Sequence, residues 1–383
     1  MVCGGIRDVE SHVLCADLGS HLVAVAPYVT DQHCRSQLDH SLCRRLSDTG
    51  SAAGDERYFS RQVHLLSPVD RAVAGTQRLT LHTSDLSHIN AYLTAQYPRG
   101  RERLVRHAGR EVWFITGVGR GLGHGIAETV LRSGRTVLGT VRRDGDAADL
   151  REKYGDRICL VTADVTDQRS VSAAVAAAVD VFGRIDVLVN NAGYTLVSGI
   201  EDATDQQIRD QFETNTFGTM SVTRQVLPVM RKQSSGRIIM VSSVAGASAA
   251  PGMGYYAATK HAIEGFAESL SKEVADLGIK VSIVQPGLFR TDTLGSSMQS
   301  TTPSDVYERS VGNLLSALTG LSGSQPGDPS RLGDALITLV EEENPPLRVP
   351  IDPGATGSVR GRLEQQLAEL DEWGPKLATE PIG

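Results

Sequence analysis

From Glu111 onward the chain alternates short apolar runs, rich in β-branched residues, with longer segments of helical periodicity. This alternation is typical of β-α-β units, whose strands pair in parallel because each connection returns through a helix. Six strands are predicted, at residues 112–116, 136–141, 158–163, 187–190, 237–242 and 280–285. We therefore predict an α/β fold, a doubly wound parallel sheet flanked by helices.

Two helices have clear sequence markers. Thr204 and Gln207 have the spacing of a capping box, so a helix is predicted to begin at Thr204. A longer helix is predicted over residues 254–277. Apolar residues recur in it every three or four positions, which predicts one buried stripe. The predicted stripe consists of Ala258, Ala262, Phe266, Leu270, Val274 and Leu277.

The composition changes near residue 110. Residues 1–110 hold four of the five cysteines, eight of the ten histidines and 13 arginines, but none of the six lysines. They also lack a sustained helix or strand period. We expect a poorly structured extension at 1–110, a single domain at 111–375 and a short tail at 376–383.

Two other interpretations of this extension remain open. His33-Cys34 and His40-x-x-Cys43 offer the ligand types that zinc prefers, but their spacing matches no standard zinc pattern, so no metal site is predicted. Alternatively, translation starts downstream at a non-ATG codon, for example at Val105 or Val112, because no methionine lies between Met1 and Met220.

Charge and hydropathy limit the partners. The net charge is -7 and no basic run occurs, so neither a nucleic acid nor an anionic membrane is expected as a partner. No apolar stretch approaches the roughly 20 residues that span a bilayer. Asp8 and Glu10 precede any apolar core, unlike a secretory signal, so a cytoplasmic location is expected.

Ligands of a parallel sheet bind beyond the carboxyl ends of the strands. The first strand is followed by the pattern T-G-x-x-x-G-x-G, which contains Gly117, Gly121, Leu122 and Gly123 and opens a helix. Glycines allow the backbone close to a pyrophosphate, and the helix amino terminus offers free N–H groups. The second strand is followed by Arg142-Arg143, and Arg120 lies in the glycine loop.

These guanidiniums favour a ribose 2′-phosphate through charge-assisted contacts, which predicts NADP(H) in preference to NAD(H), with NAD(H) still possible. Asp164-Val165 follows the third strand, where the carboxylate can bond an adenine amino group. Asn191, Ala192 and Gly193 follow the fourth, where small residues permit close approach. Turn formation explains both segments equally well.

The fifth strand ends near Ser243, and Tyr256 and Lys260 follow at the head of the long helix. Residues four apart share a helix face, so the lysine ammonium can lie beside the phenol. A nearby positive charge lowers the pKa of a tyrosine, which predicts Tyr256 as an acid or base near neutral pH. Ser243 can bond the same substrate oxygen.

Taken in order, these motifs resemble the short-chain dehydrogenase/reductase (SDR) family. The resemblance runs from residue 111 to 291 and adds the N-x-x-G motif at Asn215 and the P-G-x-x-x-T motif at Pro286, Gly287 and Thr291. It implies a Rossmann-like sheet, Tyr256 as the proton donor and acceptor, and Ser243 as the substrate-positioning residue. It further implies that Lys260 lowers the pKa of Tyr256 and holds the nicotinamide ribose, and that Asn215 supports a proton relay through its backbone.

The resemblance also implies that Pro286, Gly287 and Thr291 contact the nicotinamide, and that the chain forms a homodimer or homotetramer through the helices carrying Asn215 and Tyr256. The segment at about 288–330 is the expected place for a substrate lid, with a peripheral surface helix as the alternative. The predicted activity is NADP(H)-dependent interconversion of an alcohol with a ketone or aldehyde.

Two different functions remain open. The chain is alternatively a catalytically idle NADP-binding regulatory or scaffold protein, because a fold alone does not imply turnover. In another interpretation, residues 1–110 form a partner-binding module carried by the enzyme body.

Overall fold

The computed structural model describes residues 14–17, 22–25, 80–81, 109–291 and 298–378. The chain divides into two units, Met1–Pro98 and Arg99–Gly383. In the first unit, β1 (Leu14–Asp17) and β3 (Thr80–Leu81) both pair antiparallel with β2 (Leu22–Val25). Strands this short have too few residues for a recognisable sequence period. Apart from residues 109 and 110, the rest of the predicted extension, including His33, Cys34, His40 and Cys43, lies outside the described residues.

The second unit is built on a seven-stranded sheet in which every pairing is parallel. Its order is β12-β10-β9-β7-β4-β5-β6. The strands are β4 (Val112–Ile115), β5 (Thr136–Val141), β6 (Ile158–Thr162), β7 (Val187–Asn190), β9 (Gly236–Val241), β10 (Ile279–Pro286) and β12 (Arg348–Ile351). The chain reverses its direction of winding between β4 and β7, so the sheet is doubly wound, as predicted.

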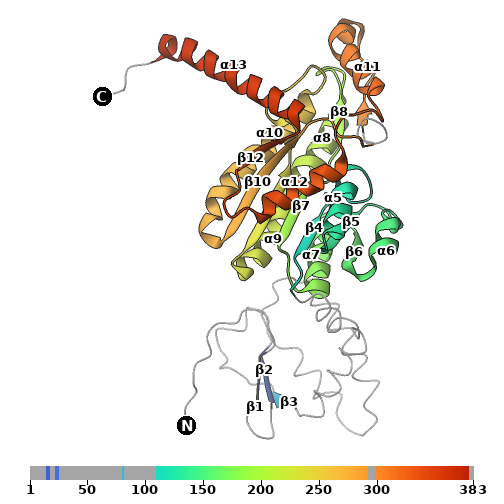
Figure 1. The fold of residues 1–383 in the computed structure, drawn as a ribbon, viewed down its shortest axis with the longest axis vertical. Helices are drawn as coiled ribbons and strands as arrows, with labels where there is room; N and C mark the ends of the chain where they lie inside the picture. Colours follow the sequence, from blue (N-terminus) through green and yellow to red (C-terminus); the bar gives the residue numbers. More distant parts are fainter. Residues whose placement is uncertain (1–13, 18–21, 26–79, 82–108, 292–297, 379–383) are drawn as a thin grey trace, which may run out of the picture. The chain divides into compact units, whose positions relative to one another are not determined.

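Six of these strands were predicted to within a residue at either end, and β12 was missed. Helices cover both faces of the sheet (Figure 1). The helices of this unit are α5 (Gly121–Arg132), α6 (Ala148–Tyr154), α7 (Gln168–Phe182), α8 (Asp205–Phe212), α9 (Thr219–Gln233), α10 (Gly254–Glu273), α11 (Asn313–Gly320), α12 (Pro329–Glu341) and α13 (Pro353–Leu377). The predicted capping box at Thr204 and Gln207 is present at the start of α8.

Alternate residues of the central strand face two different cores. Val112 and Phe114 pack with the helices α7, α9 and α10. Trp113 and Ile115 pack with α5 and α12 on the opposite face. All four side chains are fully buried, as expected for a parallel strand covered by helices on both sides.

The predicted stripe on α10 is partly wrong. Leu270 and Val274 are buried, but Ala258 and Leu277 are exposed. The buried face is shifted by about one position and includes Lys260, Ile263, Glu264 and Ala267. Hydrophobicity alone misplaced it because two charged residues lie on the buried side.

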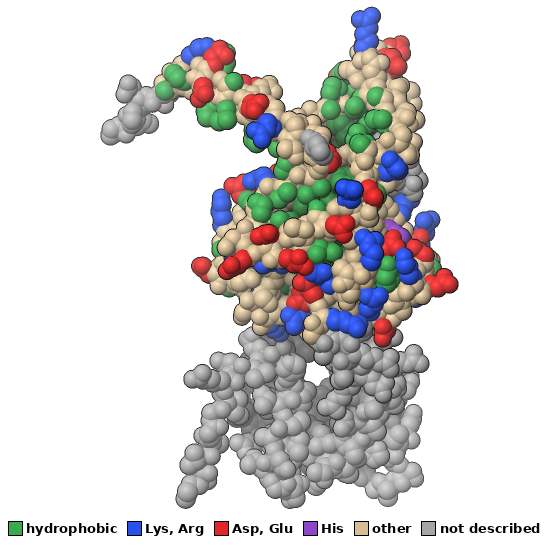
Figure 2. Space-filling view, viewed as in Figure 1, with side chains coloured by type: hydrophobic (Ala, Val, Ile, Leu, Met, Phe, Trp, Pro, Cys, Tyr) green, Lys and Arg blue, Asp and Glu red, His purple; other side chains and the backbone are tan. Residues whose placement is uncertain are grey.

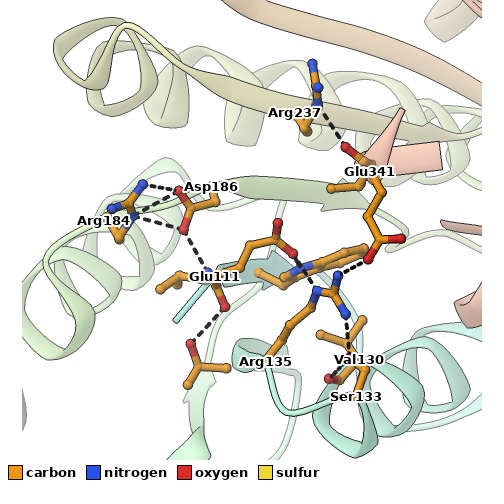
Figure 3. A network of polar contacts seen from close by, with 12 residues as sticks. Glu111, Val130, Ser133, Arg135, Arg184, Asp186, Arg237 and Glu341 are labelled. Carbon is orange, nitrogen blue, oxygen red and sulfur yellow. Dashed lines mark hydrogen bonds and ion pairs between the residues drawn. The ribbon is translucent and has the colours of Figure 1, made fainter. Parts of the chain in front are cut away.

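A network of ion pairs holds the amino-terminal edge of the sheet (Figure 3). Arg135 bonds Glu111, with 2.7 Å between Nε and Oε1, and also bonds Glu341 at the end of α12. Asp186 accepts the backbone N–H of Val112 at 2.8 Å and pairs with Arg184. The network therefore ties together residues at the starts of β4, β5 and β7.

Candidate active site

The opposite, carboxyl edge of the sheet holds a crevice of about 630 Å³. Most of the residues predicted from sequence to bind a cofactor line it. These are Gly117, Arg120, Gly121, Leu122, Arg142, Asp164, Val165, Asn191, Ala192, Gly193, Tyr256 and Lys260. Strand ends far apart in the sequence thus meet at one place, as the parallel topology requires.

The glycine loop is shaped to bring its backbone close to neighbouring atoms. Gly117 and Gly121 have φ angles of +73° and +65°, which favour glycine. A Cβ on Gly123 would lie 2.2 Å from the carbonyl oxygen of Gly117 and 2.4 Å from Nδ2 of Asn191. Gly123 does not line the crevice; it lets α5 pack against the loop, so that the helix amino terminus opens toward the crevice.

Asn191 closes this loop from the neighbouring strand. Its Nδ2 donates to the carbonyl oxygens of Thr116 at 2.9 Å and Gly117 at 3.2 Å, and its backbone N–H donates to Thr116 Oγ1 at 2.9 Å. Thr140, which the sequence analysis did not select, accepts the N–H of Gly117 at 3.0 Å. The amide turn therefore positions the glycine loop.

The far end of the crevice has both signs of charge. Arg120, Arg142 and Arg143 line it, and so does Asp146, whose carboxylate lies 3.5 Å from Arg143. Asp164 uses one carboxylate oxygen to accept bonds from the backbone and side chain of Thr166, at 2.9 and 2.8 Å. Asp164 therefore has the geometry of a turn residue while it also lines the crevice.

Tyr256 lies in the crevice at the start of α10, and its hydroxyl bonds Ser243 and Thr195. Burial raises the pKa of Tyr256 above its usual value, while the hydrogen bonds with Ser243 and Thr195 lower it less strongly. The predicted net lowering of the Tyr256 pKa is therefore wrong for this structure, because burial outweighs the contributions that lower it. Thr195 was missed because it becomes a neighbour of Tyr256 only through folding.

Lys260 is buried one helical turn below Tyr256. Its ammonium lies 5.6 Å from the centre of the Tyr256 ring and donates to the carbonyl oxygen of Val241 at 2.8 Å. Burial lowers the pKa of Lys260 to about 8, and the negative charge of Glu264 partly opposes this change.

Glu264 is the centre of a buried polar cluster that the sequence analysis missed. Its Oε1 accepts bonds from Ser242 Oγ at 2.7 Å and Gln285 Nε2 at 2.9 Å, and its Oε2 accepts from Arg348 Nε at 3.0 Å. Ser242 directly follows β9, Gln285 lies in β10 and Arg348 lies in β12. The Glu264 carboxylate therefore links three neighbouring strands beneath Tyr256. Its position four residues after Lys260 was the available signal.

Asn215 lies in a π-helical turn, η3 (Glu213–Gly218), and does not line the crevice. Its amide donates to the carbonyl oxygen of Tyr194 at 2.9 Å and accepts the N–H of Tyr194 at 3.0 Å. Its backbone oxygen accepts a bond from the Thr219 hydroxyl at 2.9 Å. The geometry therefore makes Asn215 a support for the loop that carries Tyr194 and Thr195.

The predicted nicotinamide end is less completely assembled. Pro286 and Gly287 do not line the crevice, and Gly287 N–H donates to Oδ2 of Asp352 at 3.2 Å. Thr291 faces the glycine loop, since a Cβ on Gly121 would lie 3.7 Å from the Cβ of Thr291.

The predicted lid segment contains β11 (Met298–Ser300) and α11. β11 pairs in parallel with β8 (Thr195–Val197), which begins at the tyrosine's partner Thr195.

Two further features bear on partners. Among the described residues, no helix is long and apolar enough to cross a membrane. Within the same residues, no group of three or more His, Cys, Asp or Glu side chains is arranged to hold a metal ion.

Comparison with known proteins agrees with this arrangement. The family model for short chain dehydrogenases matches residues 111–301. Oxidoreductase BOA17 of Botryotinia fuckeliana is 40% identical over 263 residues, covering 68% of this chain and 96% of its own. The chain belongs to the short-chain dehydrogenase family.

Solved structures share the fold as well. A short-chain dehydrogenase from Streptomyces avermitilis has 39% sequence identity and a TM-score of 0.66, covering 70% of this chain and 97% of its own. The structure of ElxO with NADP bound has 28% identity and a TM-score of 0.55, covering 65% of this chain and 99% of its own. The chain is thus an oxidoreductase of this family.

Proposed function

We propose that the protein is an NADP(H)-dependent oxidoreductase that interconverts an alcohol with a ketone or aldehyde. The observation that carries the proposal is Tyr256, whose hydroxyl lies in the crevice, bonded to Ser243 and Thr195, with Lys260 buried beneath it. This arrangement leaves the Tyr256 hydroxyl able to exchange a proton with the oxygen of a substrate bound in the crevice.

A nicotinamide dinucleotide fits the residues present. The glycine loop and the start of α5 offer backbone N–H groups to a pyrophosphate. Arg120 and Arg142 line the part of the crevice where a 2′-phosphate would be held, which supports NADP(H). When bound, such a cofactor supplies or accepts a hydride.

The chain's own residues handle the proton. In the direction of reduction, Tyr256 Oη gives its proton to the substrate oxygen as the C–H bond forms, leaving a phenolate. Hydrogen bonds from Ser243 and Thr195 stabilise this anion, and the charge of Lys260 does so through space. Below pH 8 the ammonium of Lys260 is mostly charged, so its contribution is largest there.

The remaining predictions belong to this proposal. They are a small-molecule carbonyl or alcohol substrate, a cytoplasmic location and a homo-oligomer formed through the helices that carry Asn215 and Tyr256. No feature of the described residues favours an idle regulator or scaffold, because Tyr256 and Lys260 line the crevice together and Ser243 bonds the Tyr256 hydroxyl.

The test combines cofactor binding with a panel of ketones and aldehydes. NADPH should raise the melting temperature more than NADH does, since a ligand that binds only the folded state stabilises it. NADPH should also be oxidised in the presence of at least one carbonyl compound. Equal shifts would remove the NADP preference alone, whereas binding without turnover across the panel would contradict the proposed reaction.

A further inference from the structure

The last half of α13 projects away from the body of the second unit (Figure 1). It exposes large apolar side chains: Leu370 is 64% exposed, Trp373 52% and Leu377 70%. They recur every three or four residues, so they lie along one face of the helix. Hydrophobic side chains on the projecting helix are visible in Figure 2.

Such a helix is not expected to be stable by itself. Most helices in proteins are stabilised by packing of their apolar face rather than by the intrinsic preferences of their residues. A row of apolar side chains that includes a tryptophan is also typical of protein interfaces. The projecting half of α13 therefore requires a partner surface.

The first half of α13 borders a groove of about 670 Å³. On the α13 side, the groove is lined by Val359, Leu363 and Leu367 among others, and on the body side by Ala247 and Gly265 among others. Its charged lining residues, apart from His261, are three arginines and two glutamates, and one of these glutamates, Glu264, is buried and paired with Arg348. The arginines are Arg348, Arg360 and Arg362.

We propose that the projecting half of α13 docks into this groove on a second copy of the chain, reciprocally and antiparallel. The two surfaces lie on the same helix, so a two-fold axis pairs each with the other and the contact closes. The lengths agree: residues 356–367 beside the groove span about 18 Å, and residues 368–377 span about 15 Å. This interface is distinct from one formed by the helices that carry Asn215 and Tyr256.

Charge complementarity supports a second copy as the occupant. Glu369 pairs with Arg362 of the same helix at 3.9 Å and Glu372 pairs with Lys376 at 2.8 Å, so the charge of this half that is left to complement a groove arginine is that of Asp371.

One pair of residues gives the interface a register. Arg360 and Asp371 are eleven residues apart, close to three full helical turns, so they lie on the same flank of the apolar face. In an antiparallel pair centred near Leu367, Arg360 of one chain lies within about one turn of Asp371 of the other. Within the described part of the chain, neither residue forms an ion pair.

The experiment measures the molar mass of the full chain by sedimentation equilibrium, comparing the unaltered protein with Leu370→Asp. The unaltered protein should be a dimer or a larger even assembly. Leu370→Asp should halve the mass, because an aspartate in the apolar contact raises the dissociation constant by about tenfold or more. Val306→Asp, at a side chain that is 79% exposed elsewhere, is the matched control and should keep the mass.

Charge reversal tests the register separately. Arg360→Glu should weaken the assembly, and adding Asp371→Arg in the same chain should restore it. The proposal would be overturned by a monomeric unaltered protein or by an unchanged mass for Leu370→Asp. It would also be overturned if Val306→Asp lost as much mass as Leu370→Asp. Failure of the double variant to recover would overturn the antiparallel register.

Discussion

The two edges of the same parallel sheet are built in opposite ways. At the amino-terminal edge, charged side chains meet opposite charges, as Arg135 does with Glu111 and Glu341 (Figure 3). At the carboxyl edge, Lys260 is buried and, among the described residues, bonds only the carbonyl oxygen of Val241, and its pKa falls to about 8. One edge therefore contributes to stability, while the other carries a charge that burial disfavours. Active sites commonly combine chemical competence with this kind of local instability.

The largest expected effect concerns activity at the carboxyl edge. Tyr256→Phe removes the proton that the substrate oxygen needs, so kcat/KM should fall by about 1000-fold, within the usual range for general acid-base groups. Tyr255→Phe is the matched control, because that hydroxyl bonds the carbonyl oxygen of Ile200. Steady-state rates with NADPH measure both. A fall of less than about tenfold for Tyr256→Phe would contradict its assigned role.

The next effect concerns cofactor choice. Arg142→Ala should raise the dissociation constant for NADPH by roughly 10- to 100-fold, the value of one charge-assisted contact to a phosphate, and leave that for NADH nearly unchanged. Fluorescence titration with each cofactor measures this difference. Arg151→Ala, an exposed arginine on α6, is the control. Parallel losses for both cofactors would mean that Arg142 does not distinguish them.

Lys260→Met tests the cost of the buried charge. The lowered pKa means that the folded protein holds the ammonium less well than the unfolded chain does. That cost is fully present below pH 8, where the lysine is protonated in both states. It declines as the pH rises from about 8 to 10.5, because in this range the folded protein has released a proton that the unfolded chain still holds.

Allowing for the lost bond to Val241, Lys260→Met should stabilise the fold at pH 7 by about 2 kcal/mol while abolishing activity. Urea denaturation at pH 7 and pH 10 should give a smaller gain at the higher pH. Lys272→Met, at a side chain that is 74% exposed, should change neither value noticeably. A destabilised Lys260→Met protein would contradict this account.

The smallest effect belongs to the amino-terminal edge. Glu111→Gln removes the charge that Arg135 faces at 2.7 Å, so it should lower stability by about 1 kcal/mol and the melting temperature by roughly 2–4 °C. Thermal denaturation measures the loss. Affinity for NADPH should stay constant, because this edge lies opposite the crevice. A changed affinity would show that the two edges are coupled.

The strands that hold the site were predictable because each is rich in apolar, β-branched residues and is followed by unusual residues. β12 was not, since its four residues include Arg348 and Pro350, and a proline is tolerated in a sheet mainly at an edge. The strand is defined by pairing with β10, a contact that no local pattern encodes.

The site residues divide in the same way. Tyr256 and Lys260 could be paired from their spacing, because a helix brings residues four apart together. The bond from Thr195 to Tyr256 and the position of Arg348 beside Glu264 depend on contacts between distant elements. The direction of the Tyr256 pKa was predicted incorrectly because the sequence gives a neighbour's charge but not the loss of water around the phenol.

The short ladder between β8 and β11 connects the predicted lid segment to the strand that begins at Thr195. Its register joins Met298 to Thr195 and Ser300 to Val197, and Ser198 and Thr301 extend it through a hydroxyl contact of 2.7 Å. Any outward displacement of residues 298–301 must break this ladder at the strand whose first residue holds the Tyr256 hydroxyl. Amide exchange in residues 195–197 would then report how often this ladder opens, and a solvent isotope effect on the rate would report whether proton transfer or the opening limits turnover.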